Sequence, residues 1–125
     1  PRPDRTVGIF YFLWLGPHAN GGPFDVSKIL SEDPLAMGQR DNPRWGPLGS
    51  PHHWADSIFG KYNSDDPYVL AKHAQMLGDA GVDVVIFDVT NQHTYSKNAK
   101  ALLDVFAQVR RNGGRTPQVA FLCPF

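Results

Sequence analysis

Residues 83–95 read DVVIFDVTNQHTY, and this segment is the most informative for the fold because it joins a continuous apolar run to a polar one. Four strongly apolar residues, 84–87, run directly into Asp88, and amide, imidazole and phenol side chains follow within residues 90–95. An apolar run without strict alternation is typical of a strand covered on both faces, as in a parallel sheet. The stretch therefore predicts a buried strand over Asp83–Val89 that ends at a polar edge.

Before and after this strand along the chain, the sequence predicts two further strands and two helices in alternation. The outer strands are expected over Val7–Trp14 and Val119–Cys123, which are rich in Val, Phe, Leu, Ile and Trp. In the last of them, Cys123 is expected to be buried as a small apolar side chain. The order β-α-β-α-β requires right-handed crossovers, so we expect an α/β fold with a parallel sheet.

Both predicted helices have recognisable ends. In the first, Asp66 suits the N-cap, Pro67 suits the first helical position and Gly81 supplies the stop. Its apolar face is predicted from residues at helical spacing: Leu70, Ala74 and Leu77. The second helix is expected from about Ser96 to Asn112. It would bury a similar face, made of Leu102, Phe106 and Val109.

The connection after the first strand is unusually long. It covers about residues 15–65, well above the usual ceiling of about 12–15 residues for a structureless loop. In βα architectures such loops leave the carboxyl edge of the sheet, where ligand sites form. Two architectures fit: an open doubly wound sheet, or the first three strands of a (β/α)8 barrel of about 250 residues. The apolar run at the end of the chain favours the barrel.

Asp88 has two interpretations. A carboxylate in a dry interior is costly unless it is paired, so at a strand end we expect it to point into a polar cleft beside residues 90–95. The alternative is that Asp88 caps backbone amides of the turn that follows it.

Aromatic and hydrogen-bonding side chains are predicted at the same edge. The first strand ends near Tyr11, Trp14 and His18. The long connection adds a larger set: Trp45, His52, His53, Trp54 and Tyr62. Pyranose rings have apolar C–H faces that stack on aromatic rings, and their hydroxyls need polar partners. The set therefore predicts a carbohydrate-binding cleft, with a small core of Trp45, Trp54 and Phe59 under the loop as the alternative.

The sequence gives little support to several other classes of function. Twelve basic and twelve acidic residues balance, so the charge pattern indicates neither nucleic acid nor a membrane surface as a partner. Zinc could be held by four residues, His52, His53, Asp88 and His93, but no HExxH helix or Cys/His ladder occurs. Phosphate-loop, dinucleotide and nucleophile-elbow motifs are also missing from the sequence. We therefore expect no metal and no cofactor.

Several segments together resemble the amino-terminal part of glycoside hydrolases of the family 71 and family 99 type: VGIFYFLWLGPH, GPFDVSKIL, WGPLGSPHHW and KYNSDDPYVLAKHAQMLGDAGVDVVIFDVTN. Those families are (β/α)8 barrels typified by endo-α-mannosidases and α-1,3-glucanases. The resemblance implies that residues 1–125 are an incomplete, amino-terminal portion of one barrel domain. The intact protein would hydrolyse α-glycosidic bonds of a polysaccharide or glycan, and export from the cell is implied as well.

The resemblance assigns sugar subsites to five residues, and the loop composition adds His52. The candidate substrate-binding residues are Tyr11, Trp14, His52, His53, Trp54 and Asn91. The partners would be an oligosaccharide or polysaccharide and the rest of the barrel. A glycan-binding barrel without catalysis, or a metal-dependent hydrolase or deacetylase, stays as an alternative.

Two departures from the family pattern affect the chemistry. After the second strand this chain has FDVTN where endo-mannosidases carry a Trp-containing stretch, which leaves the sugar open. The family's catalytic acid pair lies on later strands, so Asp88 is given only an accessory role and the 125-residue chain alone is expected to be inactive. Glu32 is expected in a loop, as a solvated charge.

Overall fold

A computed structural model describes residues 4–15 and 21–124. The chain divides into two compact units. The sheet unit consists of residues 1–14 and 64–125, and the insert unit consists of residues 15–63. The long connection predicted after the first strand therefore forms a compact unit with structure of its own.

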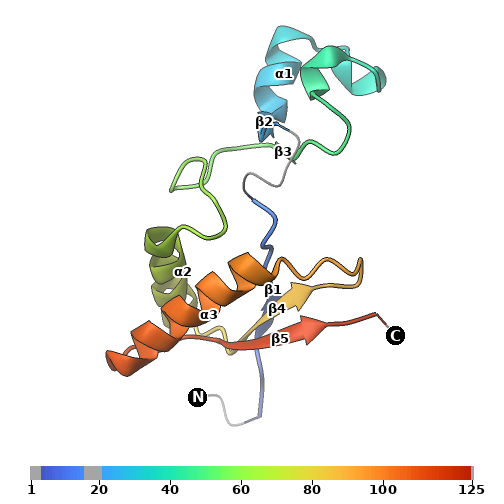
Figure 1. The fold of residues 1–125 in the computed structure, drawn as a ribbon. Helices are drawn as coiled ribbons and strands as arrows, with labels where there is room; N and C mark the ends of the chain where they lie inside the picture. Colours follow the sequence, from blue (N-terminus) through green and yellow to red (C-terminus); the bar gives the residue numbers. More distant parts are fainter. Residues whose placement is uncertain (1–3, 16–20, 125) are drawn as a thin grey trace. The chain divides into compact units, whose positions relative to one another are not determined.

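The sheet unit contains three parallel strands in the order β1-β4-β5 (Figure 1). These are β1 (Gly8–Phe10), β4 (Val84–Asp88) and β5 (Gln118–Leu122), with α2 (Pro67–Asp79) and α3 (Ser96–Arg111) as the crossovers. The predicted α/β class, the parallel sheet and the βαβαβ order are confirmed. Closure into a barrel is not seen within the described residues.

The ends of α2 follow from the capping residues in the sequence. The Asp66 carboxylate accepts hydrogen bonds from the backbone amides of Tyr68 and Val69, at 2.9 and 3.2 Å. Past the carboxyl end of α2, Gly81 has φ 74°, a left-handed conformation that glycine adopts without steric cost. Both predicted ends of this helix are confirmed.

One face of the sheet packs against α2 and α3 (Figure 1). The core consists of alternate strand residues and the apolar faces of both helices: Leu13, Val85, Phe87 and Val89 with Leu70, Ala74, Ala99, Leu102 and Phe106. The predicted faces of the two helices are confirmed, since Leu77 and Val109 also pack against this cluster.

The residues that alternate with the core along the first strand remain half exposed. Phe10 is 54% exposed, and Phe12 and Trp14 are 50% and 44% exposed. Successive side chains of an extended segment point to opposite faces, so these three rings lie on the face away from the helices. The expected burial on both faces does not occur within the described residues, because both helices pack on the same side.

The first strand is shorter than the predicted Val7–Trp14. The ladder to β4 continues only to the amide of Tyr11, which donates to the carbonyl oxygen of Ile86 at 2.9 Å. Beyond that point the carbonyl of Leu13 accepts a 2.6 Å hydrogen bond from Nδ2 of the buried Asn98 in α3. This carbonyl is therefore paired with a helix side chain instead of a neighbouring strand.

The prediction that Cys123 is buried is wrong. β5 begins at Gln118, ends at Leu122, and leaves Cys123 exposed as a free thiol just after the strand. Phe121 and Leu122 are themselves 45% and 37% exposed. The cause is the position of the helices, which in the described part of the chain cover the middle of the sheet but not the end of this edge strand.

The insert unit is built from short elements: β2 (Phe24–Asp25), α1 (Val26–Glu32), η1 (Ala36–Gly38), η2 (Pro43–Trp45) and β3 (His52–His53). The two short strands pair in parallel. Its small core consists of Val26, Ile29 and Ala36.

Glu32 is the last residue of α1, so the expectation that it lies in a loop is wrong. Its side chain is 51% exposed and its carboxylate lies 3.7 Å from Nε of Arg44. An exposed pair of this kind contributes little to stability, which agrees with the expected solvated charge.

Candidate functional site

The carboxyl ends of β1 and β4 border a small hollow in the sheet unit. Its lining includes Tyr11, Phe12, Trp14 and Asp88, with Tyr95 from the loop before α3. The volume is about 10 Å³, which is space for a single water molecule at most. A sugar ring does not fit inside, so any saccharide at this edge must lie on the open surface around the hollow.

That surface carries a stacked aromatic pair. The rings of Phe12 and Trp14 are 4.5 Å apart between centroids and inclined by 17°. They belong to residues i and i+2 of an extended segment, which places both rings on the same side. Because each ring is about half exposed, the pair presents an apolar surface to solvent.

Asp88 caps the turn that follows it. One oxygen, Oδ1, accepts hydrogen bonds from the Thr90 hydroxyl at 2.6 Å and from the Thr90 backbone amide at 3.0 Å. These two bonds hold the pKa of Asp88 below its ordinary value of 3.8, and the bond from the Thr90 hydroxyl has the larger effect. The capping interpretation is therefore observed, while the carboxylate stays solvent-exposed beside the hollow.

The charge on Asp88 limits its chemistry. With a lowered pKa, the carboxylate is ionised at neutral pH and can accept hydrogen bonds but has no proton to donate. No described residue donates a hydrogen bond to Oδ2. The group is suited to binding a ligand hydroxyl and unsuited to acting as a general acid near pH 7.

Asn91 does not line the hollow. It is exposed in the loop after β4, where its Oδ1 accepts a 3.2 Å hydrogen bond from the backbone amide of His93. The His93 ring lies 6.2 Å from the Tyr95 ring. The amide group of Asn91 thus shapes the loop that borders the hollow.

Tyr11 has a partner that the sequence reasoning missed. Its hydroxyl forms a 2.7 Å hydrogen bond with Nδ1 of His73 in α2, and the two rings meet edge to face at 5.7 Å. Burial lowers the pKa of His73 below its ordinary value of 6.5. The signal in the sequence was position: His73 lies three residues after Leu70 and four before Leu77, on the apolar face of α2.

The remaining candidates belong to the insert unit. Nε2 of His52 lies 2.9 Å from the carbonyl oxygen of Trp45, and Nδ1 of His53 lies 3.1 Å from the carbonyl oxygen of Ala55. Nε2 of His53 is buried and has no hydrogen-bond partner among the described residues. Trp54 is 61% exposed. His18, also expected near the edge, lies outside the described residues.

Within residues 4–15 and 21–124, no three His, Cys, Asp or Glu side chains gather in an arrangement that could hold a metal ion. None of the helices described is long and apolar enough to cross a bilayer.

Comparisons of this chain with protein-family models, with curated proteins and with solved structures find no match. The α/β class therefore rests on the parallel sheet itself, and the likeness to glycoside hydrolases stays a prediction.

Proposed function

We propose that this chain forms the amino-terminal part of a carbohydrate-active (β/α)8 barrel that hydrolyses α-glycosidic bonds of a glycan. The observation that supports this best is the exposed Phe12–Trp14 stack beside Asp88, at the carboxyl ends of neighbouring parallel strands. In βα folds this edge of the sheet is the one that carries ligand sites.

The chemistry of this edge matches the two sides of a sugar. The Phe12 and Trp14 rings offer flat apolar surface to C–H groups, and the ionised Asp88 offers an acceptor to a hydroxyl. The chain would thus position a saccharide without cleaving it. Cleavage needs two carboxyl groups flanking the bond, and Asp88 is the only carboxylate among the described residues that line the hollow.

The open face of the sheet also supports a barrel. Phe10, Phe12 and Trp14 place large rings on the face opposite the helices. In a (β/α)8 barrel this face is the interior, which is filled by bulky side chains from all the strands. Further parallel strands would bury Phe10, which lies within β1, while Phe12 and Trp14 lie past the carboxyl end of β1 and would stay open at the barrel mouth.

Removal of the stacking surface tests the proposed function. Trp14→Ala is expected to weaken binding of α-linked glucose or mannose oligosaccharides about tenfold, because about 1.5 kcal/mol of ring contact is lost. Titration calorimetry measures the change. Leu103→Ala removes an apolar side chain of α3 with the same degree of exposure (43% against 44%) and should leave affinity unchanged. Equal affinities for the wild type and the Trp14 variant would contradict the proposal.

A further inference from the structure

The insert unit contains a cavity whose lining residues all lie between residues 40 and 52. Its volume is about 350 Å³, and its lining includes Arg40, Asp41, Asn42, Trp45, Ser50 and His52. Small-molecule sites in proteins usually measure about 300–1,000 Å³, so this cavity is of a size to hold a small ligand.

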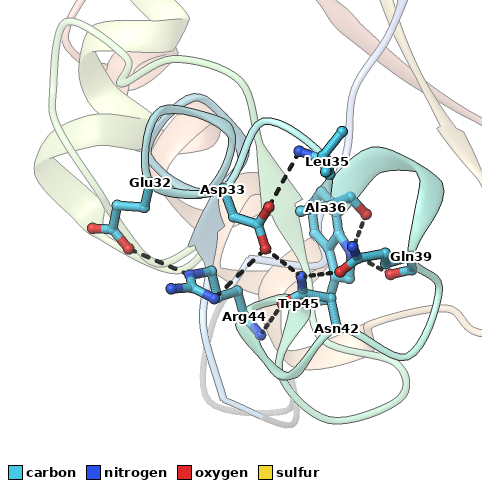
Figure 2. Close-up of polar contacts among 8 residues, drawn as sticks. All are labelled: Glu32, Asp33, Leu35, Ala36, Gln39, Asn42, Arg44 and Trp45. Atoms are coloured by element: carbon cyan, nitrogen blue, oxygen red, sulfur yellow. Dashed lines mark hydrogen bonds and ion pairs between the residues drawn. The ribbon is translucent and has the colours of Figure 1, made fainter.

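Asn42, in the wall of the cavity, is fixed by the polar network shown in Figure 2. Its side chain is buried, and Nδ2 donates to Oδ2 of Asp33 and to Oε1 of Gln39, both at 2.9 Å (Figure 2). Its Oδ1 accepts the backbone amide of Arg44 at 3.1 Å. The side-chain nitrogen and oxygen of Asn42 are both hydrogen-bonded within the protein. Asn42 therefore holds the wall in place and is not assigned a bond to a ligand.

Trp45 is held by the same network and supplies an apolar wall. Its indole Nε1–H donates to the carbonyl oxygens of Ala36 and Gln39 at 3.2 and 3.1 Å (Figure 2). Because the indole N–H is already used, what Trp45 can offer a ligand is ring surface. The ring is therefore available for stacking in a fixed position.

His52 packs against Trp45 and adds a polar group. The two rings are 5.5 Å apart in an edge-to-face arrangement, and Nε2 of His52 lies 2.9 Å from the Trp45 carbonyl oxygen. A carbonyl only accepts, so Nε2 carries a proton, and in the neutral ring Nδ1 is then an acceptor. The cavity thus has an acceptor next to its aromatic wall.

The two charged residues that line the cavity have opposite charges, which sum to zero. Arg40 and Asp41 are exposed neighbours of opposite sign, and neither side chain makes an ion pair with another described residue. They supply donors and acceptors without a net charge, which favours a neutral ligand rich in hydroxyls over a phosphate or a metal ion.

From these features we infer that the cavity binds one or two rings of a neutral saccharide, as a second carbohydrate subsite within the insert unit. Ring surface comes from Trp45, and hydroxyls bond to Arg40, Asp41 and His52. The site does not depend on the Phe12–Trp14 stack of the sheet unit.

The experiment isolates the fluorescence of Trp45. The chain has three tryptophans, so the double variant Trp14→Phe/Trp54→Phe leaves Trp45 as the sole tryptophan. Maltose and α-1,2-mannobiose serve as probes. We expect a saturable change in emission with a dissociation constant in the millimolar range, as few hydrogen bonds and one ring contribute. The indole N–H resonance of Trp45 in a nitrogen-proton NMR spectrum should shift along the same titration.

Variants in this background test the residues assigned to the site. Arg40→Ala and Asp41→Ala should each weaken binding about threefold to tenfold, the usual effect of losing one hydrogen bond. Arg40→Gln keeps a donor and should recover most of the affinity. Lys61→Ala, at an exposed residue of the same unit outside the cavity, should change nothing. A retained indole N–H resonance shows that each variant is folded.

The outcomes separate this inference from the proposed function. The absence of a saturable Trp45 response, or an equal response from Arg40→Ala, Asp41→Ala and the parent, overturns the inference even if Trp14→Ala weakens binding at the sheet edge. A Trp45 response that follows the cavity variants supports the inference even if Trp14→Ala has no effect.

Discussion

At the scale of single residues, Asp88 and Tyr11 show how local bonding limits what a candidate site residue does. Asp88 caps its own turn through one oxygen and stays ionised, so it acts as an acceptor. The hydroxyl of Tyr11 is bonded to His73 on the helix side of the sheet. Its part in the site is therefore structural: it fixes the strand end from which Phe12 and Trp14 project.

The Tyr11–His73 pair makes the stability of the sheet unit depend on pH. Burial favours neutral His73, so below pH 6.5 the unfolded chain binds a proton that the folded chain resists. The contribution of His73 to the free energy of unfolding is fully present above pH 6.5 and is lost as the pH falls below that value. His73→Gln keeps an acceptor for the Tyr11 hydroxyl but cannot titrate. Its melting temperature should fall less than that of the wild type between pH 7.5 and pH 5.

Substitution of an exposed histidine provides the control for this pH effect. His93→Gln replaces an exposed imidazole in the loop after β4, outside the helix-packed core. It should leave the pH dependence of the melting temperature as in the wild type. A His73 variant that melts with the full wild-type pH dependence would show that the half-buried His73 ring is not the cause.

At the scale of elements, the two helices of the sheet unit begin differently. α2 has a capping aspartate and a proline in the first turn, while α3 starts after Tyr95, whose backbone is left-handed (φ 44°) and whose side chain makes no capping bond. Lys97 in the first turn of α3 pairs with Asp65 at 2.7 Å, and this bond lowers the pKa of Asp65. The beginning of α3 is thus tied to the residues that precede α2.

Loss of the cap of α2 should destabilise the sheet unit. Asp66→Ala leaves the amides of Tyr68 and Val69 without their acceptor, at a cost of about 1 kcal/mol in the free energy of unfolding. Chemical denaturation followed by circular dichroism measures the loss. Asp79→Ala, at the exposed last residue of the same helix, removes an equal charge without a capping role and should not destabilise. Equal losses in the two variants would argue against capping.

At the scale of the whole molecule, the exposed aromatic rings of the first strand form an apolar surface that faces solvent. Phe10, Phe12 and Trp14 lie together along one extended segment, on the face that the helices leave open. Exposed apolar patches of this kind mark surfaces that are covered by other polypeptide or that cause association. In the proposed architecture, additional barrel strands would cover Phe10 and a bound saccharide would cover Phe12 and Trp14.

In isolation, the chain should therefore self-associate through this face. Phe10→Lys places a charge within the patch and should shift the weight-average mass in sedimentation equilibrium toward the monomer. Ile58→Lys makes the same kind of change at an 80% exposed residue of the insert unit and should have a smaller effect. A wild-type chain that stays monomeric at high concentration would contradict the expectation.

Much of the sheet unit could be predicted from the sequence because its signals are local. Apolar runs, helical spacing and the Asp66-Pro67 cap gave the three strands, both helices and their order. The end of β1 was not predicted, since no local pattern indicates that the ladder to β4 stops at Tyr11 and that the Leu13 carbonyl is bonded to Asn98, 85 residues away along the chain. The prediction that Cys123 is buried was wrong for a related reason, since only the placement of α2 and α3 decides which end of the sheet is covered.

The candidate site was predicted less completely than the fold. The sequence placed Tyr11, Trp14 and Asp88 near one edge, and all three line the same hollow. Their individual partners, His73 and Thr90, depend on side-chain directions that no pattern specified. The cavity of the insert unit was missed because its walls come from several short turns held by Asn42 and Trp45, without any periodic pattern.

Sequence patterns were sufficient to predict the α/β class, the parallel order of the strands and the polar carboxyl edge, because periodicity and capping act over a few residues. Packing of the elements was needed to show that both helices lie on one face, that the Tyr11 hydroxyl is bonded to a half-buried histidine and that the Phe12–Trp14 stack is exposed. These features arise from contacts between residues far apart in the chain, and such contacts form only when the elements pack together.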